Sequence, residues 1–207
     1  MRKIYGLALF AAAALSLAAC SNKADTASSA DTAAAQEGAD KADEGANPDL
    51  ETITIGTTGP LTGGAASYGI SVKQGAEIAI EEINKAGGVK LGDKSYNFAL
   101  QFEDDEASEE KAVTAYNTLL DKKVDVIMGA VTSGSSLAIA DLTKKDNLLQ
   151  LTPSGSAAGI TANDNVFRLC FTDPLQGKMI ADYVVNQGYE SVAVLYNNAD
   201  EYSTGVY

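Results

Sequence analysis

The 207-residue sequence contains no histidine, only two cysteines, and far fewer basic than acidic residues. Without histidine, the chain cannot form a Ser-His-Asp triad or a His-ligated zinc site. With 15 Lys and Arg against 28 Asp and Glu, its net charge is −13, so it lacks the basic surface that nucleic-acid binding requires. The composition therefore argues against a nucleic-acid-binding protein and against two histidine-dependent kinds of enzyme site.

Three short motifs of nucleotide binding and nucleophilic catalysis are also missing. The sequence has no G-x-x-x-x-G-K-[ST] and no G-x-S-x-G, and the run Gly63–Gly69 departs from G-x-G-x-x-G. Asp104 and Asp105 are adjacent, so in a strand they would point to opposite faces and make a poor catalytic pair. Together with Glu106 they do not match the spacing of a calcium loop. We therefore predict no catalytic residue, no metal site and no cofactor.

The N-terminus has the pattern of an export signal. Arg2 and Lys3 are followed by the apolar stretch Leu7–Leu17 and by Leu-Ala-Ala-Cys20, which is typical of a signal peptide over residues 1–20. The apolar stretch is too short for a stable membrane span. Leu-Ala-Ala-Cys20 resembles the lipobox of bacterial lipoproteins, in which the cysteine is lipid-modified. We therefore expect an extracytoplasmic protein anchored to a membrane through Cys20, in the periplasm or on the outer face of the cell membrane.

The next segment, residues 21–50, is predicted to be a disordered tether. From Ser21 to Asp49 it is rich in Ala, Ser, Thr, Asp and Glu and has no aromatic or β-branched aliphatic residue. Such a composition cannot bury enough apolar surface to offset the entropy of ordering the chain. We expect this segment to hold the folded part away from the membrane.

From Thr52 onward, strand-like and helix-like patterns alternate. The predicted strands are residues 52–57, 96–102, 124–128, 148–151, 166–171 and 191–196, and the predicted helices are residues 72–83, 112–120, 135–145 and 173–187. This alternation predicts an α/β fold, with a parallel sheet and helices on both faces. The strand that begins at Ser191 has too few following strands to complete a sheet, so we expect a second, truncated lobe.

Two clusters of glycine and hydroxyl residues follow neighbouring predicted strands. One is Gly129–Ser136 and the other is Thr152–Ser156. Open parallel sheets bind ligands beyond the carboxyl ends of their strands, and a helix N-terminus there favours a carboxylate or a phosphate. The alternative is that these Ser and Thr residues only cap helices. Two adjacent loops of this kind favour a ligand site.

From Thr52 to Tyr207 the chain resembles the amino-acid-binding lipoproteins of bacterial ABC transporters, in the branched-chain (Leu/Ile/Val-binding) family. This resemblance implies a periplasmic-binding-protein-like fold of type I, in which two α/β lobes close on a ligand. It makes residues 51–170 the first lobe, residues 171–207 the incomplete beginning of the second, and the whole an N-terminal fragment. The matching stretches are IGTTGPLTGGAASYG, VKQGAEIAIEEINKAGGV, VIMGAVTSGSSLAIADL, LLQLTPSGSAAGIT, FRLCFTDPLQGKMIADYV and LYNNADEYSTGVY.

The resemblance also implies ligand-binding roles in the first lobe. Tyr68 stands where the family has an aromatic residue lining the cleft, although ordinary packing is the alternative for this side chain. Val131 and Thr132 match backbone and wall positions. Ser133 matches the hydroxyl that receives the ligand carboxylate together with nearby N–H groups.

Four further positions follow from the same resemblance. Ser154 matches a backbone-carbonyl contact to the α-ammonium group, and Gly155 lies beside it in the same loop. Ser156 stands where the family has a threonine hydroxyl that touches the head group of the amino acid. Tyr202 matches a residue of the second lobe that closes over the ligand, again with ordinary packing as the alternative.

The leading hypothesis is therefore a solute-binding lipoprotein that captures an aliphatic or branched-chain amino acid and delivers it to an ABC permease. An alternative with the same fold is a ligand-sensing receptor domain for amides or other small solutes. An enzyme that uses Ser133 or Ser156 would need a lysine as its base. Lys144 and Lys145 are predicted to face solvent, so the enzyme hypothesis is disfavoured.

Overall fold

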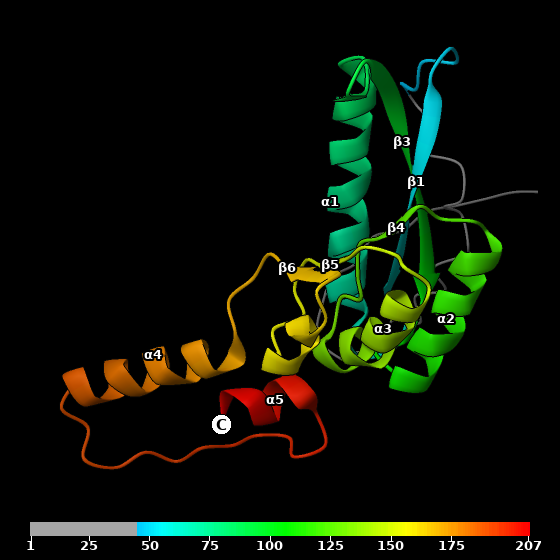
Figure 1. Cartoon of the computed structure of the whole chain (residues 1–207). Helices are drawn as coiled ribbons and strands as arrows, with labels where there is room; N and C mark the ends of the chain where they lie inside the picture. Colours follow the sequence, from blue (N-terminus) through cyan, green and yellow to red (C-terminus); the bar gives the residue numbers. More distant parts are fainter. Residues whose placement is uncertain (1–44) are drawn as a thin grey trace, which may run out of the picture. The chain divides into compact units, whose positions relative to one another are not determined.

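A computed structural model describes residues 45–207, drawn in colour in Figure 1. The predicted signal peptide, the lipidation site Cys20 and the predicted tether up to residue 44 lie outside the described residues. The last residues assigned to the tether contact the folded part. The Asn47 N–H donates to Asn97 Oδ1 (3.1 Å), and Asn97 Nδ2 donates to the Asn47 carbonyl (2.8 Å). Ordered contacts therefore begin before residue 51.

Six strands form one sheet in the order β2-β3-β1-β4-β5-β6 (Figure 1). β1 lies near the centre and pairs in parallel with β3 over nine residues, from Glu51 opposite Tyr96 to Gly59 opposite Asp104. β1 pairs with β4 on its other side, and β4, β5 and β6 continue in parallel. The strands are β1 (Glu51–Gly59), β2 (Val89–Leu91), β3 (Lys94–Asp104), β4 (Val126–Ile127), β5 (Gln150–Thr152) and β6 (Val166–Arg168).

Helices lie on both faces of the sheet. α1 and α2 both contact β3 but lie on opposite sides of it in Figure 1, and α3 packs beside α2. The predicted α/β fold with helices on both faces is therefore confirmed. The helices are α1 (Ala66–Lys85), α2 (Glu109–Asp121), α3 (Ser133–Lys145), the short 3₁₀ helix η2 (Ala158–Ala162), α4 (Asp173–Asn186) and α5 (Glu201–Val206). None of the helices in residues 45–207 has the length and apolarity that crossing a membrane requires.

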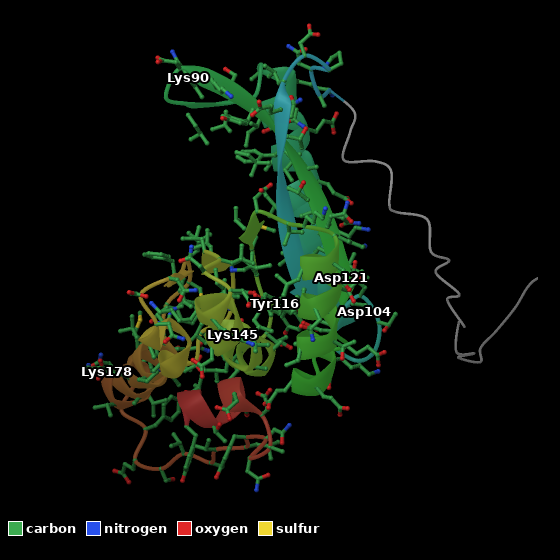
Figure 2. All side chains as sticks on the ribbon, turned by 45° about the vertical axis from the view of Figure 1, so that its right-hand side comes forward. Lys90, Asp104, Tyr116, Asp121, Lys145 and Lys178 are labelled. Carbon is green, nitrogen blue, oxygen red and sulfur yellow. The ribbon has the colours of Figure 1, made fainter. Side chains whose placement is uncertain are left out.

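The main core lies between α2, α3 and the sheet. Tyr116, Leu119, Ile127 and Ile139 are fully buried there and form one cluster with smaller apolar side chains. The ring of Tyr116 points inward from α2, and its hydroxyl donates to Asp146 Oδ2 (2.9 Å) just beyond the end of α3 (Figure 2). A buried hydroxyl costs free energy unless it is hydrogen-bonded. Because Tyr116 finds its partner only when α2 packs beside α3, this hydrogen bond favours that packing.

Two features of the sheet differ from the sequence prediction. β2 was not predicted, and it pairs with β3 in an antiparallel hairpin, so the sheet is mixed rather than wholly parallel. Gly92 turns the hairpin with a positive φ of 62°. The predicted strand over residues 191–196 is wrong, because no described segment pairs with it and Leu195 is 99% exposed. An apolar alternating pattern becomes a strand only when a neighbour accepts its backbone hydrogen bonds.

Candidate ligand-binding site

The order of the strands locates the candidate site. After β1 the chain passes through α1 to β3 on one side, and the next strand, β4, lies on the other side of β1. The loops after β1 and β4 therefore leave the sheet in opposite directions. Open α/β sheets bind ligands in the crevice between two such loops. The two loops meet there, because a Cβ built on Gly59 would lie only 2.4 Å from Val131 Cγ2. Gly59 has to be glycine for the end of β1 to approach Val131 this closely.

The loop after β4, residues 129–132, leads directly into α3. Thr132 has the extended conformation of an N-cap residue, but its side chain makes no capping hydrogen bond, and Thr132 Oγ1 is buried without a partner in the described structure. The first N–H groups of a helix have no intrahelical acceptor and carry a partial positive charge. The first turn of α3 has no acidic residue of its own, but the Glu109 side chain of α2 lies against it, because a Cβ built on Gly134 would be 3.0 Å from Glu109 Oε1. An anion at this end of α3 would find the first N–H groups of the helix and Thr132 Oγ1 as donors.

Ser133 joins this loop to the second hydroxyl loop, residues 152–157. Its side chain is buried (4% exposed), and its Oγ accepts hydrogen bonds from the N–H groups of Ser156 (3.1 Å) and Ala157 (3.2 Å). The Ser154 hydroxyl donates to the Val131 carbonyl (2.6 Å). The structure thus brings together six predicted positions, from Val131 to Ser133 and from Ser154 to Ser156. The hydroxyl proton of Ser133 is still available to donate to a ligand.

The two predicted tyrosines lie apart from these contacts. Tyr68, in the first turn of α1, is 68% exposed. The next residue, Gly69, packs tightly against the loop after β1, because an added Cβ there would lie 2.0 Å from the Pro60 carbonyl oxygen. Tyr202, in α5, is 42% exposed and hydrogen-bonds through its hydroxyl to Gln176 of α4. No hydrogen bond in the described structure joins either ring to the hydroxyl loops, so their predicted ligand contacts stay predictions.

Asp173 is a candidate residue that the sequence did not single out. Its backbone N–H donates to the Ser156 carbonyl (3.1 Å), which places α4 directly beside the second hydroxyl loop. The side chain is fully buried, and neither carboxylate oxygen has a hydrogen-bond partner in the described structure. It lies against α5, because a Cβ on Gly205 would be 2.5 Å from Asp173 Oδ2. An acidic residue in the first turn of a helix is an ordinary sequence feature, so only the structure reveals the unpartnered carboxylate.

The sequence matches the model of a protein family described as periplasmic binding protein over residues 52–206, which includes every described helix and strand except the first residue of β1. The chain belongs to this family. The resemblance drawn from the loop motifs is therefore confirmed at the level of the family.

Individual relatives of this periplasmic binding protein agree with that assignment. The chain is 39% identical over 148 residues to a Leu/Ile/Val-binding protein homolog of Brucella melitensis, covering 70% of this chain and 39% of the relative. Among solved structures, it resembles a branched-chain amino acid transporter substrate binding protein of Streptococcus pneumoniae in complex with isoleucine, with 30% identity and a TM-score of 0.70. That match covers 75% of this chain and 44% of the other.

A third relative has a ligand of another class. It is a solute binding protein of an ABC transporter of Rhodopseudomonas palustris, in complex with 3,4-dihydroxybenzoic acid. The identity is 25%, the TM-score is 0.65, and the match covers 75% of this chain and 41% of the other. This chain thus spans about two fifths of the length of the relatives it matches.

Asp104 supports the loop after β1, and its neighbour Asp105 contacts β1 itself. No group of three or more acidic or cysteine side chains within residues 45–207 could hold a metal ion. Asp104 accepts hydrogen bonds from the Leu61 N–H (2.8 Å) and the Thr62 hydroxyl (2.6 Å) of that loop, and from the Glu106 N–H (2.9 Å). Figure 2 places it at the opposite end of the long strands from Lys90. Burial alone would raise the pKa of Asp104, but these hydrogen bonds outweigh it and hold the pKa below the usual value of 3.8.

Asp105 points the other way and is fully buried. Its Oδ2 accepts from the Thr58 hydroxyl (2.7 Å), and its Oδ1 accepts from the Ala107 N–H (2.9 Å). Burial raises the pKa of Asp105 above its usual value of 3.8, although these hydrogen bonds oppose the change. The pKa values of the two neighbouring carboxyl groups are therefore shifted in opposite directions.

We expect the variants Asp104→Asn and Asp105→Asn to show this opposition. The depressed pKa of Asp104 gives stability that is present above about pH 3.8 and is lost as the pH falls through the folded-state pKa. Its Asn variant should lose stability relative to the wild type as the pH rises. The raised pKa of Asp105 gives stability that is present below about pH 3.8 and is lost as the pH rises through the folded-state pKa. Its Asn variant should gain relative to the wild type over the same range.

Urea unfolding at intervals between about pH 3 and pH 7 would measure both differences, each variant serving as the control for the other. Curves that run parallel to the wild type in both variants would contradict the prediction.

Proposed function

We propose that the chain forms one side of a binding site for an α-amino acid with an aliphatic side chain, in a substrate-binding lipoprotein that delivers the amino acid to an ABC permease. The observation that carries this proposal is the junction of the two hydroxyl loops at Ser133. It lies at the N-terminus of α3 and at the point where the loops after β1 and β4 diverge. The names of the Brucella and Streptococcus relatives support the choice of ligand.

The carboxylate of the amino acid fits the N-terminus of α3. The first N–H groups of that helix, the buried and unpartnered Thr132 Oγ1 and the remaining proton of the Ser133 hydroxyl are the donors at this helix end. Hydrogen bonds to a charged acceptor are about twice as strong as those between neutral groups. These donors would hold the carboxylate without any lysine or arginine side chain.

The ammonium group requires acceptors, and Asp173 is the candidate with a full negative charge. A buried carboxylate without a partner is costly, and an ammonium group beside it would supply both a hydrogen bond and an opposite charge. A ligand without an amine, such as the 3,4-dihydroxybenzoic acid of the Rhodopseudomonas protein, has no use for such a group. Gly205 of α5 covers this carboxylate, so contact with an ammonium group requires α5 to move away from Asp173. Once that contact is made, Asp173 favours amino acids over simple carboxylates.

The proposal includes the arrangement of the whole protein. Residues 1–20 are the signal peptide, Cys20 carries the lipid, residues 51–170 form the first lobe, and residues 171–207 begin the second. Tyr68 and Tyr202 would then face the ligand from the two lobes. A mature N-terminus whose mass lacks lipid at Cys20 would overturn the anchoring.

Calorimetric titration and thermal shift of the mature full-length protein test the function. The ligands should include leucine, isoleucine, valine, alanine, their amides, 4-methylpentanoate (leucine without its amine) and 3,4-dihydroxybenzoate. A ligand present at about 100 times its Kd should add about 2.7 kcal/mol to the free energy of unfolding. We expect one or more of the aliphatic amino acids to do so. Stabilisation by the aromatic or amine-free acid alone, or by amides alone, would overturn the proposed ligand.

A further inference from the structure

Thr152 ends β5 and begins the second hydroxyl loop, but it is not one of the predicted ligand contacts. Its side chain is fully buried. Its hydroxyl donates to the Ala130 carbonyl in the loop after β4 (2.8 Å) and accepts from the Gly155 N–H in the loop after β5 (2.8 Å). The Ser136 hydroxyl lies 3.4 Å away and donates to the same Ala130 carbonyl (2.9 Å). One hydroxyl group thus connects the backbones of the two loops.

The space around this hydroxyl leaves no room for the second loop to shift inward. A Cβ built on Gly155 would lie 2.6 Å from Ser136 Oγ and 2.7 Å from Thr152 Oγ1, both shorter than real Cβ contacts. Gly155 therefore rests directly on the two hydroxyls. Its neighbours Ser154 and Ser156 are the residues that reach across to Val131 and Ser133. The position of the Thr152 hydroxyl consequently sets the position of both loop-joining contacts.

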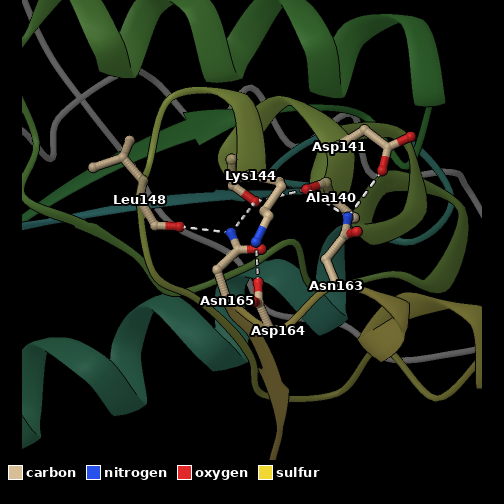
Figure 3. Close-up of polar contacts among 8 residues, drawn as sticks. Ala140, Asp141, Lys144, Leu148, Asn163, Asp164 and Asn165 are labelled. Atoms are coloured by element: carbon tan, nitrogen blue, oxygen red, sulfur yellow. Dashed lines mark hydrogen bonds and ion pairs between the residues drawn. The ribbon is translucent and has the colours of Figure 1, made fainter.

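The buried polar network continues away from the site beneath α3. Gln150 Nε2 donates to the Gly129 carbonyl (3.0 Å), and Gln150 Oε1 accepts from the Thr143 hydroxyl (2.9 Å). Asn165 Nδ2 lies 3.2 Å from the Thr143 hydroxyl and 2.8 Å from the Leu148 carbonyl, the second of which is drawn in Figure 3. Thr143 is as fully buried as Thr152, but its hydroxyl contacts neither hydroxyl loop. The chain therefore contains a matched control for Thr152.

We propose that Thr152 is a positioning residue for ligand binding, whose hydroxyl locks the loop after β4 and the loop after β5 into one preorganised unit. This inference rests on the proposed function, because the ligand groups are held by those loops. The ligand does not touch Thr152. A preorganised site binds more tightly because less ordering remains to be done when the ligand arrives. Removing the hydroxyl should therefore weaken binding even though every ligand-contacting side chain remains.

The test compares Thr152→Val, Thr152→Ser and Thr143→Val in the mature full-length protein. Valine keeps the shape of threonine but removes the hydroxyl, so both valine variants should have lower Tm values than the wild type. We expect Thr152→Val to weaken leucine binding by about tenfold or more, which corresponds to about 1.4 kcal/mol or more. Thr152→Ser should recover most of this loss, and Thr143→Val should keep the affinity of the wild type within about threefold.

Amide hydrogen exchange at Gly155 provides a second readout that does not depend on a ligand. It should become faster in Thr152→Val and stay near the wild-type rate in Thr143→Val, because only Thr152 accepts the Gly155 N–H. Equal losses of affinity in the two valine variants, or unchanged Gly155 exchange in Thr152→Val, would overturn the proposal. If the wild type binds no amino acid, the proposed function fails. The exchange rates then still decide whether Thr152 couples the two loops.

Discussion

Replacing Asp173 by asparagine should weaken leucine binding by about 3 kcal/mol or more, which is at least about a hundredfold in Kd. The fully buried carboxylate of Asp173 has no hydrogen-bond partner among the described residues, and the backbone N–H of the same residue donates to the Ser156 carbonyl. Breaking a buried pair of opposite charges by removing one partner leaves the other charge uncompensated, which is why the expected loss is large. Titration calorimetry with the full-length protein measures this loss directly.

The same substitution should act in the opposite direction on the ligand-free protein. Asparagine removes a buried charge that has no partner, so the free energy of unfolding should rise by about 1 kcal/mol or more. Affinity for 4-methylpentanoate, which has no amine, should change little, so the preference for leucine over this acid should largely disappear.

Asp182→Asn is the matched control, because Asp182 lies on the same helix but is exposed and paired with Lys178. Equal losses of affinity for leucine and 4-methylpentanoate in Asp173→Asn would show that Asp173 does not face the ammonium group.

The sequence predicts those parts of the fold whose pattern is local. The apolar spacing over residues 72–83 and 112–120 predicted α1 and α2, and every predicted helix is present with somewhat different ends. β2 was missed because three residues, two of them exposed, carry no periodic signal. Residues 191–196 have a strong strand pattern but form no strand. A strand depends on its neighbours in the sheet, whereas a helix satisfies its own backbone.

The candidate site was predictable only as far as residue type and chain order allow. Hydroxyl residues after two neighbouring strands indicated a ligand site, and the structure does bring Ser133 to the backbone of Ser156. The hydroxyls of Thr152 and Ser154 both donate to the loop after β4, but which carbonyl each one reaches depends on side-chain direction, which the sequence does not contain. The unpartnered state of Asp173 is likewise a property of three-dimensional packing, and no local pattern contains it.

Replacing Ser133 by alanine should reduce both affinity and stability. The ligand carboxylate would lose one charge-assisted hydrogen bond, which should weaken binding by about 1–3 kcal/mol, or about 5- to 150-fold. In addition, the buried N–H groups of Ser156 and Ala157 would lose their acceptor. Leaving two buried donors unsatisfied should lower the free energy of unfolding by about 2–4 kcal/mol. Urea unfolding and titration calorimetry separate the two effects.

Ser135→Ala is the control for this experiment. Ser135 lies in the same turn of α3 and is equally buried, but its hydroxyl makes no hydrogen bond to the second loop in the described structure. We expect its leucine affinity to stay within about threefold of the wild type. Unchanged affinity in Ser133→Ala together with a large loss of stability would make Ser133 purely a structural link between the loops. The carboxylate would then depend on the N-terminus of α3 and Thr132, because these are the remaining donors at the junction of the two loops.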